Sequence, residues 1–191
     1  MPSAALTRWQ TDRMSRLGHV DAHCATLFAA SGPTAPSPLA EDSLQGYVVL
    51  LSGHFQGFCR DLYTESAQAC ANAAPAGLRA AVQRQFTSEL KLNAGNPTLE
   101  NIQTDFKRFG FLLDIAAAHP ANTRRITHLA QLRSWRNAVA HQMPAPAPSG
   151  TPAALKLSDV QTWRASCDGL ATSLDGIMFS ELGMIVGVAP W

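Results

Sequence analysis

An arginine and a histidine five positions apart, in the run RSWRNAVAH at 133–141, are the residues of this chain best suited to chemistry at a phosphate. Arg136 can hold a phosphate through two parallel hydrogen bonds and can stabilise negative charge in a transition state. A histidine side chain titrates near neutral pH, so the imidazole of His141 is suited to take up or return the proton of a hydroxyl group. These two residues are therefore the first candidates for a catalytic role.

The position of Arg136 is unusual for a helix in a bundle. At about 100° per residue, a helix through this run places its apolar residues in one arc that also contains Arg136. These apolar residues are Leu129, Leu132, Trp135, Val139 and Met143. An unpaired guanidinium among apolar side chains would cost several kcal/mol. The Arg136 guanidinium must therefore pair with an anionic group or lie in a solvent-filled cleft.

Two interpretations follow for Arg136. In one, the guanidinium pairs with a carboxylate of the core such as Asp61, Glu65 or Asp114, and the chain is a helical scaffold. In the other, the arc faces a second copy of the chain, and Arg136 lines the cleft between them. On one helix the side chains of Arg136 and His141 project about 140° apart, which is awkward for contact with the same phosphate. In a twofold dimer, Arg136 of one copy could lie near His141 of the other.

The elements that must position this run are helices. Apolar residues recur at steps of three and four, which predicts an all-α fold, an up-down bundle of about five helices with proline-rich linkers. The expected elements are an N-terminal helix at about 3–30, a long helix from about 39, a helix through 102–116, the helix carrying RNAVAH, and a last helix opening at LSDV. Breaks are expected at 31–38, 72–77, 93–97, 119–123 and 144–152.

The length and composition of the chain lead to expectations about its domain organisation and its surroundings. A chain of 191 residues with 46% hydrophobic residues fits one domain, 1–191, with a core at about 39–182 and an apolar tail at 183–191 that docks on the bundle or a partner. The tail is too short to span a bilayer, so no membrane is expected. The first residues lack the apolar stretch of a signal peptide, which favours a cytoplasmic setting.

Charge and cysteine content limit the possible partners. Fifteen basic and fourteen acidic residues give a net charge of +1, so binding of RNA would need a local basic patch. The four cysteines form no C-x-x-C pair, and no histidine follows them at the spacing of a zinc finger, so no metal site is expected.

Three features of this chain, and their order along the sequence, resemble the HEPN (higher eukaryote and prokaryote nucleotide-binding) superfamily. RNAVAH at 136–141 resembles its R-x4-H motif, and LLSGHFQGFCRDLYTE at 50–65 is similar to its second-helix signature. The motif also comes late in a helical bundle and is followed by a linker and a last helix. The resemblance covers about residues 39–182 and is closest to RiboL-PSP-type HEPN proteins.

The resemblance implies a homodimer with a composite, metal-independent ribonuclease site and no cofactor. Arg136, Asn137 and His141 match the motif, with Asn137 orienting the phosphate or the histidine and His141 acting on the ribose 2′-hydroxyl. It also implies a toxin or defence effector that cuts RNA, with a possible antitoxin protein as partner. The alternative in the same family is a non-catalytic module that binds RNA, a nucleotide or a protein.

Four further residues are candidates for substrate binding. Arg133 and Arg125 precede the motif and could form the basic patch that RNA requires. His54 and Gln56 lie in the second-helix signature. Gln56 stands where many relatives carry glutamate, which removes an acidic group from that position.

Overall fold

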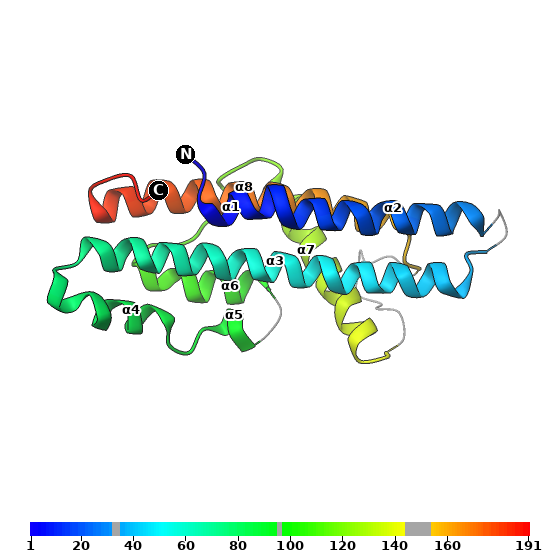
Figure 1. Cartoon of the computed structure of the whole chain (residues 1–191), viewed down its shortest axis with the longest axis horizontal. Coiled ribbons are helices and arrows are strands. Elements are labelled where there is room, and N and C mark those ends of the chain that lie inside the picture. Colours follow the sequence, from blue (N-terminus) through cyan, green and yellow to red (C-terminus); the bar gives the residue numbers. More distant parts are fainter. Residues whose placement is uncertain (32–34, 95–96, 144–153) are drawn as a thin grey trace.

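The computed structural model, described over residues 1–31, 35–94, 97–143 and 154–191, is built from helices, with no strand in these ranges (Figure 1). The all-α prediction is confirmed. The longer elements are α2 (Met14–Ala30), α3 (Pro38–Ala73), α7 (Asn122–Ala140) and α8 (Leu157–Val186). The shorter elements are α1 (Ala4–Arg8), η1 (Trp9–Arg13), η2 (Ala76–Leu78), α4 (Arg79–Thr87), α5 (Lys91–Ala94), α6 (Leu99–Phe106) and η3 (Lys107–Phe109).

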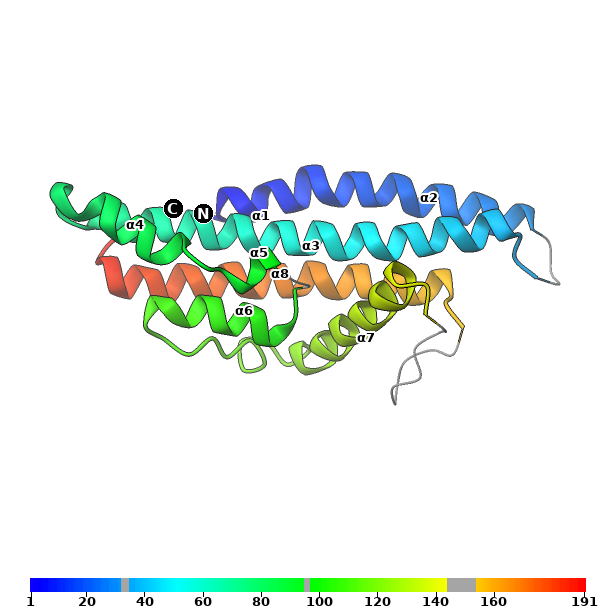
Figure 2. The same cartoon turned by 90° about the horizontal axis from the view of Figure 1, so that it is seen from below.

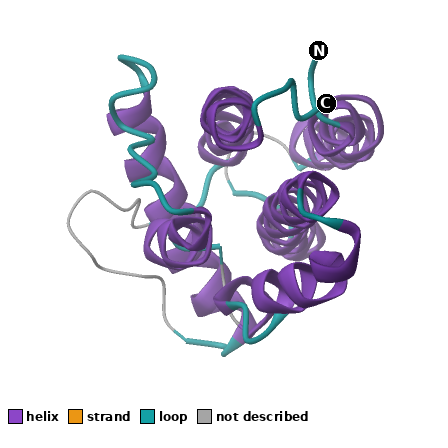
Figure 3. Cartoon of the chain, turned by 90° about the vertical axis from the view of Figure 1, so that its left-hand side faces the viewer, coloured by secondary structure: helices purple, strands orange, loops and turns teal. Residues whose placement is uncertain are grey.

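The long helices α2, α3 and α8 run alongside one another, and α7 crosses them obliquely (Figures 1 and 2). Figure 3 shows the bundle from one end, with the helices arranged around a common core. α7 packs on α8 and α3. The helix that carries the RNAVAH motif therefore lies on one side of the bundle, with its other side exposed.

Local sequence explains where the longest helix begins and ends. The Ser37 hydroxyl accepts a hydrogen bond from the Ala40 backbone amide, and Pro38 occupies the first turn, where its missing amide hydrogen is harmless. α3 ends at Ala73, shortly before Pro75, because a residue that precedes proline disfavours helical backbone angles. Its apolar stripe, from Leu44 to Leu62, is buried as the spacing predicted.

Two of the sequence predictions for helices need correction. The helix expected through 102–116 divides into α6 and the short η3, because Gly110 adopts a left-handed conformation (φ 93°) that ends the helix. α4 was not predicted, since it buries none of its residues and lacks an apolar stripe. In place of about five helices, the described residues form a few long helical segments and several short ones.

The C-terminal tail packs on the bundle. α8 continues through 183–186, and Gly187 (φ 76°) then turns the chain back. The Trp191 ring lies with its centroid 6.2 Å from that of Phe179. α8 is long and apolar enough to cross a membrane by length and composition, but one face of it, including Trp163 and Leu170, is buried in the protein core.

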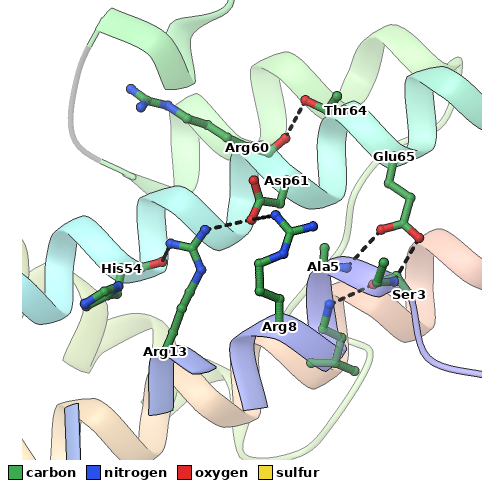
Figure 4. A network of polar contacts seen from close by, with 11 residues as sticks. Ser3, Ala5, Arg8, Arg13, His54, Arg60, Asp61, Thr64 and Glu65 are labelled. Atoms are coloured by element: carbon green, nitrogen blue, oxygen red, sulfur yellow. Dashed lines mark hydrogen bonds and ion pairs between the residues drawn. The ribbon is translucent and has the colours of Figure 1, made fainter. Parts of the chain in front are cut away.

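The first residues of the chain are fixed to α3 and α8 by carboxylates. Glu65 accepts hydrogen bonds from the backbone amides of Ala4 and Ala5, both at 2.9 Å, and Asp175 accepts one from the Ser3 amide at 3.2 Å. The Ser3 hydroxyl caps the same turn (Figure 4). The free amides at the start of α1 are thus satisfied by two other helices.

Asp175 makes this contact dependent on pH. Burial raises the pKa of Asp175 above its usual value of 3.8, and the charge of Glu65 adds to the shift, although hydrogen bonds from Ser3 act the other way. The folded state therefore holds more protons than the unfolded state, so this group adds stability as pH falls towards 3.8. We expect Asp175→Asn to raise the free energy of unfolding at pH 7. In urea titrations its advantage over wild type should shrink at lower pH; a constant advantage would contradict this explanation.

A second polar network joins α1 and η1 to α3 (Figure 4). Asp61 accepts hydrogen bonds from Arg8 at 2.9 Å and Arg13 at 2.7 Å, and Arg13 also donates to the His54 carbonyl at 3.2 Å. The Arg13 guanidinium lies directly against Gly57, so that a Cβ at position 57 would overlap it. Gly57 therefore permits this close approach, whereas Gly53 faces open space.

Matched alanine substitutions should separate these two glycines. Gly53→Ala should stabilise the protein by about 0.5–1 kcal/mol, because alanine favours a helix and nothing obstructs it. Gly57→Ala gains the same propensity but displaces Arg13 from Asp61, and a hydrogen bond to a charged group is worth about 1.5–3 kcal/mol. Urea unfolding should rank Gly53→Ala above wild type and Gly57→Ala below it. Equal stability of the two variants would show that Arg13 contributes nothing.

Candidate functional site

The buried face of α7 turns around the helix along its length. Its buried apolar residues follow every third position, at Leu129, Leu132, Trp135 and Ala138. Because three residues advance only about 300°, each step moves the buried direction by about 60°. This drift accompanies the oblique crossing of α7 in Figure 2. Leu129, Leu132 and Trp135 of the arc expected from the sequence are buried, whereas Val139 is half-buried and Met143, beyond the end of α7, is 54% exposed.

The drift explains the position of Arg136. Near residue 136 the buried direction is set by Trp135 and Ala138, so Arg136 lies on the flank of the helix and is half-buried. One of its terminal nitrogens donates to the Asn137 side-chain oxygen at 3.3 Å. Within the described ranges Arg136 forms no ion pair. The arginine thus remains accessible from outside the chain.

The three carboxylates considered as partners of Arg136 all have other roles. Asp61 binds Arg8 and Arg13, as described above. Glu65 binds the first amides of α1. Asp114 accepts a hydrogen bond from the Ala117 amide in the segment before α7. The interpretation of Arg136 as half of a core ion pair with one of these residues is therefore incorrect.

His141 lies exposed at the C-terminal end of α7. Its backbone amide donates to the Asn137 carbonyl at 3.0 Å, and the next residue, Gln142, has a left-handed backbone (φ 51°). The Met143 amide closes this turn on the Ala138 carbonyl at 2.9 Å. The ring has no hydrogen-bond partner in the described part of the chain.

The exposed surface of the second half of α7 is basic and has small side chains. Arg133 is exposed, as are Ala130 and Ala140 on either side of it. The sequence of α7 contains arginines and no aspartate or glutamate. Small residues let another helix approach closely, and the absence of acids leaves the positive charge available to an anion.

Arg125, the other basic residue expected to bind substrate, lies instead between α7 and α8. One of its terminal nitrogens donates to the Asn122 side-chain oxygen at 2.9 Å, and its guanidinium lies against Gly169 of α8. The neighbouring Arg124 is exposed. Consecutive residues point about 100° apart on a helix, and here Arg124 faces solvent while Arg125 lies against α8.

Gln56 and His54 lie away from the motif within one chain. The Gln56 amide nitrogen donates to the Leu92 carbonyl at 2.8 Å, and Arg60 binds the same oxygen at 2.8 Å, so these residues hold the α5 segment against α3. His54 lies towards α2, where burial lowers its pKa and Arg13 and Arg16 add to the effect. The end of α7 and residues Leu44 and Gln45 of α3 line one cavity, and these two residues lie about 14 Å along α3 from His54 at 1.5 Å per residue.

Sequence reasoning missed two features beside the motif. A cavity of about 940 Å³ lies behind the end of α7, with walls that include Phe28, Leu44, Trp135 and Leu157. It joins the ends of four helices, so no local pattern could indicate it. On the α8 side, the His128 ring nitrogen and the Ser166 hydroxyl are 2.7 Å apart, and burial lowers the pKa of His128.

Comparisons with known proteins add no further assignment. No family model, no curated protein and no solved structure matches the chain. Within the described residues, no group of three or more histidine, cysteine, aspartate or glutamate side chains could hold a metal ion. The candidate functional site rests on the geometry of α7, with Arg133, Arg136 and Asn137 on the helix and His141 at its C-terminal cap.

Proposed function

We propose that this chain is a metal-independent endoribonuclease of the HEPN type, acting in the cytoplasm as a homodimer in which the two copies of α7 meet about a twofold axis. The observation that carries the proposal is that Arg136 has no carboxylate partner among the described residues. It is half-buried, forms no ion pair among the described residues, and lies on the same helix as His141. An unpaired half-buried cation is costly unless an anion or a wet cleft accompanies it.

A dimer solves the geometry of the two side chains. Arg136 and His141 point about 140° apart on one helix, so one copy cannot easily apply both to one phosphate. Around a twofold axis, Arg136 of one copy can face His141 of the other. The exposed alanines beside Arg133 allow the two helices to approach closely.

The reaction follows from the residue types. His141 takes the proton of the ribose 2′-hydroxyl, and the 2′-oxygen forms a bond to phosphorus as the bond to the 5′-oxygen breaks. The departing 5′-oxygen receives the proton back from His141. Arg136 holds the phosphate and stabilises its added charge, and Asn137 supports the guanidinium through the hydrogen bond between them. The products are a 2′,3′-cyclic phosphate and a 5′-hydroxyl.

A toxin or defence effector is the biological role we propose for such an enzyme, with an antitoxin protein as its partner. The second candidate function is a non-catalytic module that binds RNA, a nucleotide or a protein. The placement of Gln56 favours it, because this amide is bound to the Leu92 carbonyl and supplies no acidic group. Binding of RNA without any cleavage would identify the module.

Incubation of purified protein with mixed RNA in EDTA tests the proposal. We expect cleavage to continue under chelation and to leave 2′,3′-cyclic phosphate ends, because the nucleophile is the neighbouring 2′-hydroxyl and the proton carrier is a side chain. Mass spectrometry of the fragments identifies the ends. Loss of cleavage in EDTA, or fragments that end in a 3′-hydroxyl, would contradict the proposed mechanism.

A further inference from the structure

Two histidines lie one helical turn apart on the outer face of α2. His19 and His23 are both exposed, while Leu17 and Cys24 on the opposite side of the helix are buried. Side chains four positions apart on a helix lie on one face, with Cβ atoms about 5–6 Å apart. The same spacing lets two histidines of a helix bind one metal ion in metalloproteases. The buried side of α2 holds the helix, and thus the pair, in place.

Neither imidazole is occupied by other contacts. Within the described ranges, no hydrogen bond or ion pair involves the ring of His19 or His23. Arg16, three positions before His19 on the helix, is paired with Asp12 at 3.0 Å. Asp21 is turned towards α8, where it accepts a hydrogen bond from Gln161 at 3.3 Å. Among the described residues, no partner therefore competes with a ligand, and Arg16, the arginine next to the pair, is already bound to Asp12.

We propose that His19 and His23 form a binding site for a divalent late transition-metal ion, of the class Cu²⁺, Ni²⁺ or Zn²⁺. Imidazole nitrogen suits these ions, with affinity expected to be highest for Cu²⁺. The pair supplies two ligands, and water fills the other positions. This is fewer than the three or four protein ligands of catalytic and structural zinc sites, so the ion exchanges with solvent. The second imidazole acts as a tethered ligand, which raises affinity by about 10²–10⁴ over one histidine.

This site is separate from the RNA-cleavage site proposed above. α2 and α7 lie on opposite sides of the bundle, with α3 and α8 between them (Figure 2). Binding at α2 places no ion near Arg136 or His141. The metal site and the metal-independent nuclease can therefore be tested separately, and either can fail without the other.

Calorimetric titration of the full chain, free of any histidine tag, with NiCl₂ and CuCl₂ tests the site. Wild type should bind one ion per chain, and His23→Ala should lose at least about 100-fold in affinity. The matched control combines His23→Ala with Ala25→His, which keeps the number of histidines but places the second ring about 240° around the helix from His19. Position 25 is exposed, so this variant should fold, as circular dichroism can verify.

The control should bind as weakly as His23→Ala, and addition of Ni²⁺ should raise the melting temperature of wild type alone, since a ligand that binds only the folded state stabilises it. Wild-type affinity in the transposed variant would overturn the proposal, because it would place the ion elsewhere. Absence of binding to wild type, or one ion shared by two chains, would overturn it as well.

Discussion

Replacement of His141 by alanine should lower RNA cleavage by at least about 100-fold, because a positioned acid–base group contributes about 10²–10⁴ to a rate. Arg136→Ala should produce a loss of at least similar size, since removal of one group that stabilises transition-state charge costs about 10²–10³. Both variants should fold normally. His141 is exposed, and the Arg136 guanidinium bonds only to the adjacent Asn137 among the described residues. Changes of stability within about 0.5 kcal/mol are typical of such positions.

Cleavage assays alongside urea unfolding of the same samples check this prediction. Arg84→Ala is a suitable control, since Arg84 is an exposed arginine on α4 and lies outside the candidate site. It should keep both activity and stability. Arg136 is a structural residue and the chain is a scaffold if the free energy of unfolding of Arg136→Ala is several kcal/mol below that of wild type while His141→Ala still cuts RNA.

Trp9→Ala should have the largest effect on stability, a loss of about 3–5 kcal/mol. Trp9 is fully buried, and its ring centroid lies 5.9 Å from that of Phe55 and 5.7 Å from that of Phe58. Its indole nitrogen donates to the Asp168 carboxylate at 2.9 Å, which ties the start of the chain to α8. Since domains are stable by about 5–15 kcal/mol, this single change should remove a large part of the total.

Trp9→Phe separates packing from the hydrogen bond. It keeps an aromatic ring against Phe55 and Phe58 but leaves Asp168 without the indole donor, which should cost about 1.5–3 kcal/mol. Thermal and urea unfolding of both variants can be compared directly. A Trp9→Ala protein as stable as wild type would show that α1 and η1 are not part of the folded core.

The long helices could be predicted from the sequence because the apolar stripe of each helix is a local pattern. The stripe of α3 and that of α8 are buried as their spacing predicted. The division of the helix expected at 102–116 depends on the left-handed Gly110, which an apolar stripe does not report. The short α4 buries no side chain, so periodicity gave it no signal.

The candidate site was predictable only where it is contained in one helix. Arg133, Arg136 and Asn137 lie on α7 and His141 caps its C-terminal end, so one helix carries all four. The role of Arg125 depends on Gly169, and that of Gln56 depends on Leu92, both far away in the sequence. The exposure of Arg136 depends on the angle at which α7 crosses its neighbours, since that angle turns the buried face. Contacts and angles of this kind arise from tertiary packing.

A mixing experiment with two inactive variants tests the composite ribonuclease site most directly. When Arg136→Ala and His141→Ala chains are co-expressed, half of the dimers should be mixed, and each mixed dimer should contain one site with Arg136 and His141 both intact, from different copies. Cleavage should therefore return to about a quarter of the wild-type rate, although each variant alone is inactive. If the co-expressed protein forms mixed dimers but cuts RNA no faster than the single variants, Arg136 and His141 of different copies do not share a site.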